Sequence, residues 1–247
     1  LIVLGGLSFV LNQLIKRSLN ATVGKGDPVD YLLLVTLVAL VLLGTIFSAL
    51  FFFMDSSTWT SSLFFYLMTA VLGLGIFVPW LQYLIKRHPL FWLVEFLIQS
   101  KTRLYLLAFW AFLFLLACGV VFQNSKKSME SKKPQVSTIT RKYFHFLAVV
   151  VYIPGVMYDR HLLYVAAVVC LAVLVLLEYV RYFRIKPFGQ TLRTLLTLFL
   201  DERDSGPLIL SHICLLLGMS LPVWLFPRLC ATSLSGPSTL LPYCGIL

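Results

Sequence analysis

Long apolar runs separated by short polar stretches divide the chain along its whole length. A helix needs roughly 20 apolar residues to cross a bilayer core about 30 Å thick. The runs that approach or reach this length are residues 1–15, 31–54, 63–85, 104–122, 143–158, 161–180 and 208–226. A further apolar stretch begins near Thr239. A transmembrane barrel would instead alternate apolar and polar residues in segments of about ten. The pattern therefore predicts an all-α polytopic transmembrane protein, with about seven spans and a truncated eighth.

Two basic connections, residues 124–142 and 181–207, lie between the later runs. The link at Asp159–Arg160 is minimal, so the runs on either side of it form a helical hairpin that returns the chain to the same side. The positive-inside rule places both basic connections in the cytoplasm. The chain thus divides into N-terminal transmembrane helices (1–123), a basic cytoplasmic loop (124–142) and a second transmembrane region (143–247).

The topology of the first half is left open by the sequence. Residues 88–100 are moderately apolar and flanked by Lys and Arg, which favours an interfacial helix over a span. Strict alternation places this basic stretch on the lumenal side, against the positive-inside rule. The sequon Asn20-Ala21-Thr22 falls on the lumenal side too, and whether Asn20 is glycosylated stays open.

Composition supports a membrane protein. Of the 247 residues, 60% are hydrophobic and 12% charged, whereas soluble domains have about 45–50% apolar and about 25% charged residues. The net charge of +10 does not indicate a nucleic-acid partner, because no basic stripe is interleaved with soluble structure. The five cysteines include no C-x-x-C pair, so they predict neither a metal site nor a redox motif.

Charged residues at the cytoplasmic ends of the later spans are candidates for phosphate chemistry. Arg141 and His145 are four residues apart and share one helix face, with Lys142 beside them. The hairpin brings Glu178 to the same depth, where it could pair locally with Arg181 or across the helices with Arg141. The alternative is structural: Arg141 and Lys142 would only set the topology, and Glu178 would form a structural pair.

An amphipathic segment and an acidic block follow. Apolar residues recur at helical spacing over 190–200, which predicts a helix lying on the membrane. Asp201, Glu202 and Asp204 come directly before a span, where carboxylates suit Mg²⁺ and an Asp can act as a base toward a hydroxyl. The alternative is a solvated turn in which Asp204 caps the next helix. His212 lies one turn into that helix and is placed to face the same site.

Several blocks in this half resemble the dolichol kinase family. The N-terminal half is similar to that family only as a series of hydrophobic spans. The blocks are Arg141-Lys142-Tyr143-Phe144-His145, Ile153-Pro154-Gly155, Leu177-Glu178-Tyr179, Arg184-Ile185-Lys186-Pro187, residues 199–207, residues 208–212 and Leu221-Pro222-Val223-Trp224.

The resemblance implies a multi-pass enzyme of the endoplasmic reticulum membrane. It would transfer the γ-phosphate of CTP to dolichol and form dolichyl phosphate for protein glycosylation, with Mg²⁺ or another divalent cation as cofactor. Region 143–247 would then be the start of the kinase-like part. The Gly/Asp-rich CTP-binding segment of the family follows the point at which this chain stops, so we expect the fragment alone to be inactive.

The roles that the resemblance implies fall on the charged residues already singled out. The catalytic candidates are Asp201, Asp204 and His145; the candidates for binding substrate phosphates are Arg141, Lys142 and Arg203; those with a structural or supporting role are Glu178 and His212; and the metal ligands are Asp201, Glu202 and Asp204. A polytopic transporter of an anionic or lipid substrate is the alternative function. It predicts an inverted repeat or broken helices near mid-membrane, and the sequence shows no repeat.

Overall fold

The computed structural model describes residues 27–53, 58–130, 138–197 and 210–225. Every regular element within these ranges is a helix, which confirms the all-α prediction. The elements are α2 (Pro28–Phe53), α3 (Trp59–Leu72), the π-helical turn η1 (Gly73–Phe77), α4 (Val78–Ile85), α5 (Pro89–Ile98), α6 (Lys101–Glu130), α7 (Thr138–Tyr158), α8 (Arg160–Tyr182), α9 (Phe188–Thr197) and α10 (Leu210–Leu225).

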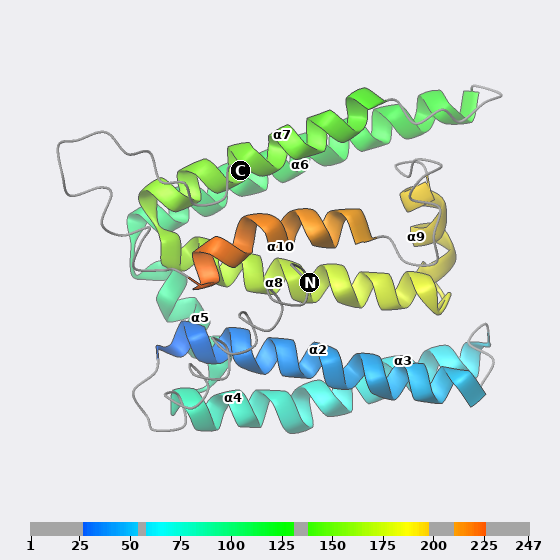
Figure 1. The fold of residues 1–247 in the computed structure, drawn as a ribbon, viewed down its shortest axis with the longest axis horizontal. Helices are drawn as coiled ribbons and strands as arrows, with labels where there is room; N and C mark the ends of the chain where they lie inside the picture. The colour runs from blue at the N-terminus through cyan, green and yellow to red at the C-terminus, as the bar shows by residue number, and fades with distance from the viewer. Residues whose placement is uncertain (1–26, 54–57, 131–137, 198–209, 226–247) are drawn as a thin grey trace, which may run out of the picture.

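The long helices run side by side in nearly one direction, and α8 lies in the middle between α2 and α10 (Figure 1). Helices α3 and α4 form one continuous rod through η1. Pro79 follows this π turn closely. A proline ring clashes with the carbonyl four residues before it, and a wider turn relieves that clash.

Among the described residues, four helical segments are long and apolar enough to cross a membrane: Pro28–Phe52, Trp59–Ile85, Lys101–Val120 and Arg160–Tyr182. They match the predicted runs 31–54, 63–85, 104–122 and 161–180. The runs 143–158 and 208–226 are also helical, with shorter apolar stretches at His145–Tyr158 and His212–Leu225. The predicted segments 1–15 and 239–247 lie outside the described residues, so the total of about seven spans stays a prediction.

Two helices extend beyond the bounds that hydropathy predicts. Helix α6 continues to Glu130 and α7 begins at Thr138, so helix occupies much of the predicted basic loop 124–142. The apolar run ends where the bilayer ends. The helix continues past the apolar run, because Lys, Gln and Glu have good helix propensity.

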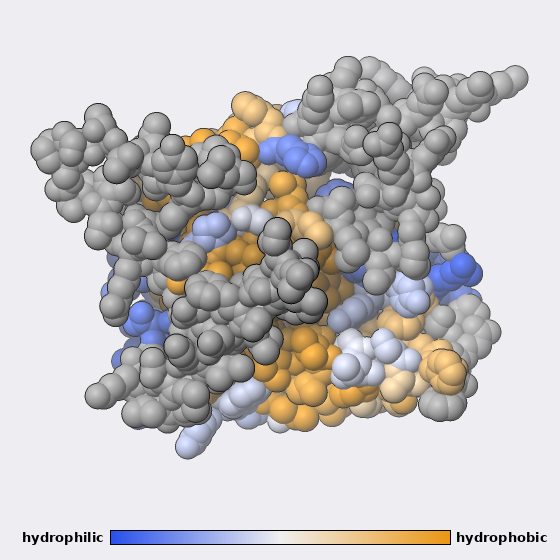
Figure 2. All heavy atoms as spheres, viewed as in Figure 1, coloured by the Kyte–Doolittle hydropathy of each residue, from blue (hydrophilic) through white to orange (hydrophobic). Residues whose placement is uncertain are grey.

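The core forms where α8 packs against its neighbours. One cluster joins α2 and α10 to α8 through Leu33, Leu163, Val168 and Val223. The second joins α2 to the α3–η1–α4 rod and to the chain after α8. Its buried members include Phe47, Phe65, Phe183 and Ile185. The outward faces stay apolar: exposed side chains of α6 include Phe112, Phe114 and Leu115. Figure 2 shows mostly hydrophobic surface in the middle of the visible described part, with hydrophilic residues at its left and right and a few near its top.

Polar contacts connect α2 and α8 near both ends of their packed faces. The hydroxyl of Tyr164 donates to Asp30 Oδ1 at 2.8 Å, and that of Tyr179 donates to the carbonyl of Leu40 at 3.0 Å. Tyr179 fits because Gly44 has no side chain, since a Cβ there would lie 2.4 Å from the Tyr179 hydroxyl. Small residues allow this kind of close approach between membrane helices.

Candidate functional site

The described helices that carry predicted site residues have their site-bearing ends at one end of the bundle. The hairpin is confirmed: α7 ends at Tyr158 and α8 begins at Arg160. The first turns of α7, the last turn of α8, helix α9 and the start of α10 therefore lie at the same end, on the right in Figure 1. Both predicted basic connections leave from this end. Helix α5 and the start of α6 lie at the opposite end.

Glu178 and Arg181 form a buried, two-pronged ion pair in the last turns of α8. Arg181 Nε donates to Glu178 Oε2 at 2.8 Å, and Arg181 Nη2 donates to Oε1 at 2.5 Å. Only 9% of each side chain is exposed. The spacing of three residues makes the pair local, as one of the two predicted arrangements requires. The other arrangement involves Arg141, whose side chain lies outside the described residues, so it stays untested.

The turn after α8 is a Schellman motif. The amide of Ile185 donates to the carbonyl of Val180 at 3.0 Å, and that of Arg184 donates to the carbonyl of Arg181 at 3.2 Å. These are the two hydrogen bonds that satisfy the last carbonyls of a helix in this motif. Its left-handed position usually holds glycine, but here Arg184 occupies it with φ 54°. Ile185 is fully buried and holds the turn against the core.

The start of α3 supports the same turn from the other side. The amide of Lys186 donates to Ser62 Oγ at 2.9 Å, and the Ser62 hydroxyl donates to the carbonyl of Thr58 at 3.0 Å. Ser62 is 1% exposed, so these bonds are protected from water. No sequence pattern indicates this contact, because 124 residues separate the two partners.

Helix α9 crosses the end of the bundle at a steep angle to the spans (Figure 1). The predicted amphipathic helix over 190–200 is present, begins earlier at Phe188 and is described to Thr197. Gly189 lets α9 start so close to α8. A Cβ at Gly189 would lie 2.6 Å from the carbonyl carbon of Arg184 and 2.9 Å from the carbonyl oxygen of Val180.

The remaining predicted residues divide into three groups. His145 is exposed on α7, and His212 is exposed near the start of α10. Arg141 and Lys142 belong to α7, but their side chains are not described. The other members of the predicted site lie outside the described residues: Asp201, Glu202, Arg203 and Asp204. No group of three His, Cys, Asp or Glu residues with metal-binding geometry occurs in the described part of the chain. The metal prediction therefore stays a prediction.

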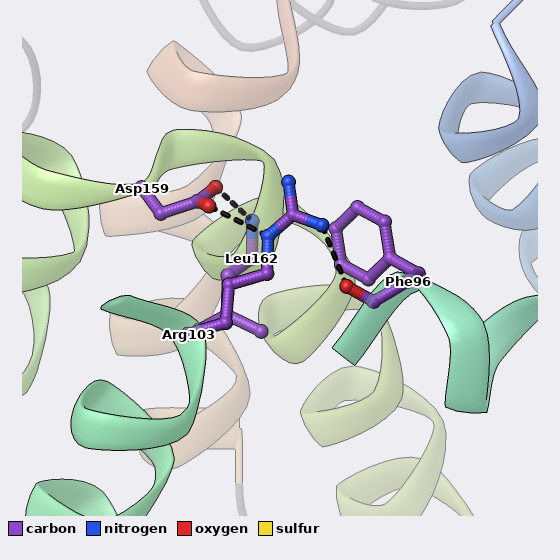
Figure 3. Close-up of polar contacts among 4 residues, drawn as sticks. All are labelled: Phe96, Arg103, Asp159 and Leu162. Carbon is purple, nitrogen blue, oxygen red and sulfur yellow. Dashed lines mark hydrogen bonds and ion pairs between the residues drawn. The ribbon is translucent and has the colours of Figure 1, made fainter. Parts of the chain in front are cut away.

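A second polar cluster, at the opposite end, is one that the sequence did not predict. Arg103 Nε donates to Asp159 Oδ2 at 2.7 Å, and Nη1 donates to the Phe96 carbonyl at 2.6 Å (Figure 3). The guanidinium carbon also lies 3.8 Å from the centre of the Phe96 ring. The other carboxylate oxygen of Asp159 accepts from the amide of Leu162 at 2.9 Å and so caps α8. The only feature of the sequence that indicates part of this cluster is an Asp at the start of a helix, a common capping residue.

Two of the basic residues at this end are paired with carboxylates. Arg103 is neutralised by Asp159, and Arg87 pairs with Glu95 at 3.1 Å. Between them lies α5, the helix predicted over 88–100. Its ten residues extend about 15 Å, half the thickness of a bilayer core, so it cannot cross alone. Its interfacial position stays a prediction.

Comparison with known proteins supports the family resemblance that the sequence blocks indicate. Residues 1–216 match the model of the family described as dolichol kinase, so the similarity includes the N-terminal half and extends beyond the sequence blocks named above. The chain belongs to the dolichol kinase family. All of it aligns with dolichol kinases of Mus musculus at 65% identity and of Homo sapiens at 64%, in each case over 47% of the relative.

More distant members of the dolichol kinase family also match. The dolichol kinase EVAN of Arabidopsis thaliana is 32% identical over 189 residues, which are 75% of this chain and 30% of that protein. The chain spans about half the length of the mammalian dolichol kinases. No solved structure matches it. Family membership and the long apolar helices together identify a multi-pass membrane protein.

Proposed function

We propose that the protein transfers the γ-phosphate of CTP to the terminal hydroxyl of dolichol. The product, dolichyl phosphate, would serve protein glycosylation at the endoplasmic reticulum membrane. The supporting observation is the 65% identity with a mouse dolichol kinase over the whole chain. Because the chain spans about half of that relative, the activity is proposed for the complete protein that carries this sequence. The 247 residues by themselves are proposed to be inactive.

The position of the described site-bearing helix ends, all at one end of the bundle, fits this reaction. The hydroxyl of a polyprenol must reach the membrane surface, and a nucleotide comes from water. Phosphoryl transfer depends chiefly on positioning and on neutralising phosphate charge. Arg141 and Lys142 in the first turn of α7, together with Arg203, would bind the phosphates. Helix α9 would cover the place where the lipid hydroxyl enters.

The acidic block would supply the remaining chemistry. Asp201, Glu202 and Asp204 offer the carboxylate oxygens that Mg²⁺ prefers, so the donor set fits the cation. When bound there, Mg²⁺ would neutralise phosphate charge. One of Asp201, Asp204 and His145 would accept the proton of the attacking hydroxyl. The Glu178–Arg181 pair would fix the end of α8, and His212 would support the site from α10.

The alternative function, transport of an anionic or lipid substrate, has less support. Such transporters bind their substrates near mid-membrane between interrupted helices. Within the described ranges, α2 and α8 are unbroken helices, and the π-helical turn η1 widens the α3–α4 rod without ending it. The ion pairs between described residues lie at the two ends of the bundle, not at its middle.

A phosphorylation assay tests the proposal. The complete protein is expressed in cells that lack dolichol kinase, and their microsomes are incubated with dolichol and γ-labelled CTP or ATP. We expect label in dolichyl phosphate with CTP and little with ATP. Absence of labelled lipid, or equal labelling from ATP, would contradict the proposal.

A matched pair of variants tests the acidic block. Asp204→Asn should lower the rate about 100-fold or more, because a positioned acid or base typically contributes that much. Asp27→Asn is the control, since Asp27 is exposed beside the start of α2 at the opposite end. It should retain full activity. Full activity of Asp204→Asn would remove Asp204 from the site without affecting the proposed reaction.

A further inference from the structure

Two basic side chains extend from the turn between α8 and α9. Arg184 is exposed and Lys186, two residues later, is half-buried. Neither forms an ion pair with any residue in the described ranges, whereas the nearby Arg181 is fully engaged with Glu178. The turn therefore presents positive charge that the described part of the chain does not neutralise.

The backbone that carries these charges is fixed in place. The two Schellman hydrogen bonds hold Arg184, and the bond from the Lys186 amide to Ser62 Oγ holds the next turn of chain against α3. Binding groups on a rigid backbone lose less entropy when a ligand arrives. The arrangement is thus preorganised.

Exposed aromatic side chains flank the turn that carries the two cations. The Lys186 ammonium lies 5.9 Å from the centre of the Trp59 ring. Trp59 begins α3 and is 64% exposed, and Tyr182 and Phe188 on either side of the turn are exposed as well. Tryptophan and tyrosine at such positions lie among lipid headgroups. A ligand here would meet both cations and apolar surface.

We propose that Arg184 and Lys186, beside Trp59, bind the phosphate of an anionic phospholipid headgroup. The negative phosphate would lie between the guanidinium and the ammonium, and the acyl chains would run along the exposed aromatic rings. Anionic lipids are concentrated in the cytoplasmic leaflet, the side predicted for this end of the bundle. The inference goes beyond the proposed phosphotransfer and does not depend on it.

The left-handed conformation of Arg184 allows a variant that removes the charge without straining the backbone. Glycine adopts φ 54° without strain, so Arg184→Gly removes the charge while favouring the observed backbone. Lys86 provides a matched control. It is also exposed and left-handed, with φ 60°, but it ends α4 at the opposite end of the bundle. Lys86→Gly therefore makes the same backbone and charge change away from the site.

The test uses the complete protein in nanodiscs of phosphatidylcholine with phosphatidylserine, followed by native mass spectrometry of retained lipid. We expect Arg184→Gly and Lys186→Gln each to lower phosphatidylserine retention about fivefold, since each cation near a membrane surface is worth about that factor. Lys86→Gly should retain as much as the unchanged protein. The melting temperature of Arg184→Gly should not fall, which separates lipid binding from folding.

Three outcomes would overturn the proposal. The first is unchanged retention in both Arg184→Gly and Lys186→Gln. The second is an equal loss in Lys86→Gly, which would indicate a response to net charge alone. The third is displacement of phosphatidylserine by an equal amount of dolichyl phosphate, which would identify a lipid phosphomonoester as the ligand. Loss of CTP-dependent activity in the variants is not part of the test, so failure here leaves the proposed function standing.

Discussion

Arg103 Nε lies 2.7 Å from Asp159 Oδ2, although 56 residues separate the two side chains. The contact joins the start of α6 to the junction between α7 and α8, and the bond from Arg103 to the Phe96 carbonyl adds α5. Both charged side chains are nearly buried, with 14% and 13% exposed. This end of the bundle is therefore held by one guanidinium and one carboxylate, away from the predicted catalytic end.

Asp159→Ala should destabilise the protein by about 2–4 kcal/mol. It removes the cap of α8, worth about 1 kcal/mol, and leaves the Arg103 charge nearly buried without its partner. The free energy of unfolding in mild detergent measures the loss. Asp159→Asn keeps the cap and should cost less. Glu95→Ala is the control: its pair with Arg87 is mostly exposed, so its removal should change stability little. If Asp159→Ala proved as mild as Glu95→Ala, the contact would have no structural role.

Gly44→Ala should separate α2 from α8. The new Cβ would lie 2.4 Å from the Tyr179 hydroxyl, which is held by its bond to the Leu40 carbonyl. Overpacking of this kind costs about 1–3 kcal/mol. Thermal unfolding in nanodiscs measures it. Gly119→Ala on α6 is the matched control, because nothing lies within 4 Å of its added Cβ.

A double variant identifies the cause of that loss. Tyr179→Phe removes the atom that the Gly44→Ala methyl group would meet, so the two changes together should cost less than their sum. Additive costs would show that Gly44 matters for backbone flexibility and not for its contact with Tyr179.

The helices themselves were predictable because the apolar length that a bilayer requires can be read from one continuous stretch of sequence. Long apolar runs predict spans wherever they occur, and α2 and α8 match their runs within a few residues. The helical spacing of apolar residues over 190–200 predicted α9. The Glu178–Arg181 pair was predictable because its partners are three residues apart on one helix.

Contacts between distant segments were not predictable. The partners of the Lys186–Ser62 bond are 124 residues apart, and those of the Tyr164–Asp30 bond 134 apart. No local sequence pattern indicates which helices pack against each other. The structure does not test the catalytic part of the site, because its acidic block lies outside the described residues. Asp201 and Asp204 therefore stay predictions from sequence and resemblance.

Glu178→Gln should be strongly destabilising, by about 3–5 kcal/mol, because it leaves the nearly buried Arg181 charge without its carboxylate. Replacing both residues, Glu178→Leu with Arg181→Leu, should recover much of the stability, since a buried ion pair contributes little relative to apolar residues of similar size. Unfolding of both variants in detergent measures this. If the double variant is stable but phosphorylates dolichol poorly, the pair positions the site. Full activity would limit it to structure.

Gly189→Ala should displace α9 from the end of the bundle. Its Cβ would approach the Arg184 and Val180 backbone to 2.6–2.9 Å, and backbone atoms cannot move aside as a side-chain tip can. Because α9 is proposed to cover the site, we expect CTP-dependent phosphorylation of dolichol to fall at least tenfold, a loss that corresponds to about 1.4 kcal/mol of barrier. Activity is measured per folded protein in microsomes.

Gly73→Ala supplies the control for that variant. Gly73 lies in the rod formed by α3 and α4, and nothing is within 4 Å of its added Cβ. The same glycine-to-alanine change is thus made where there is space, and activity should be unchanged. Protease accessibility near Phe188 should rise in Gly189→Ala alone, because the turn would no longer close against α8. Normal activity together with a displaced turn would show that α9 is an anchor for the chain and not a cover for the substrate.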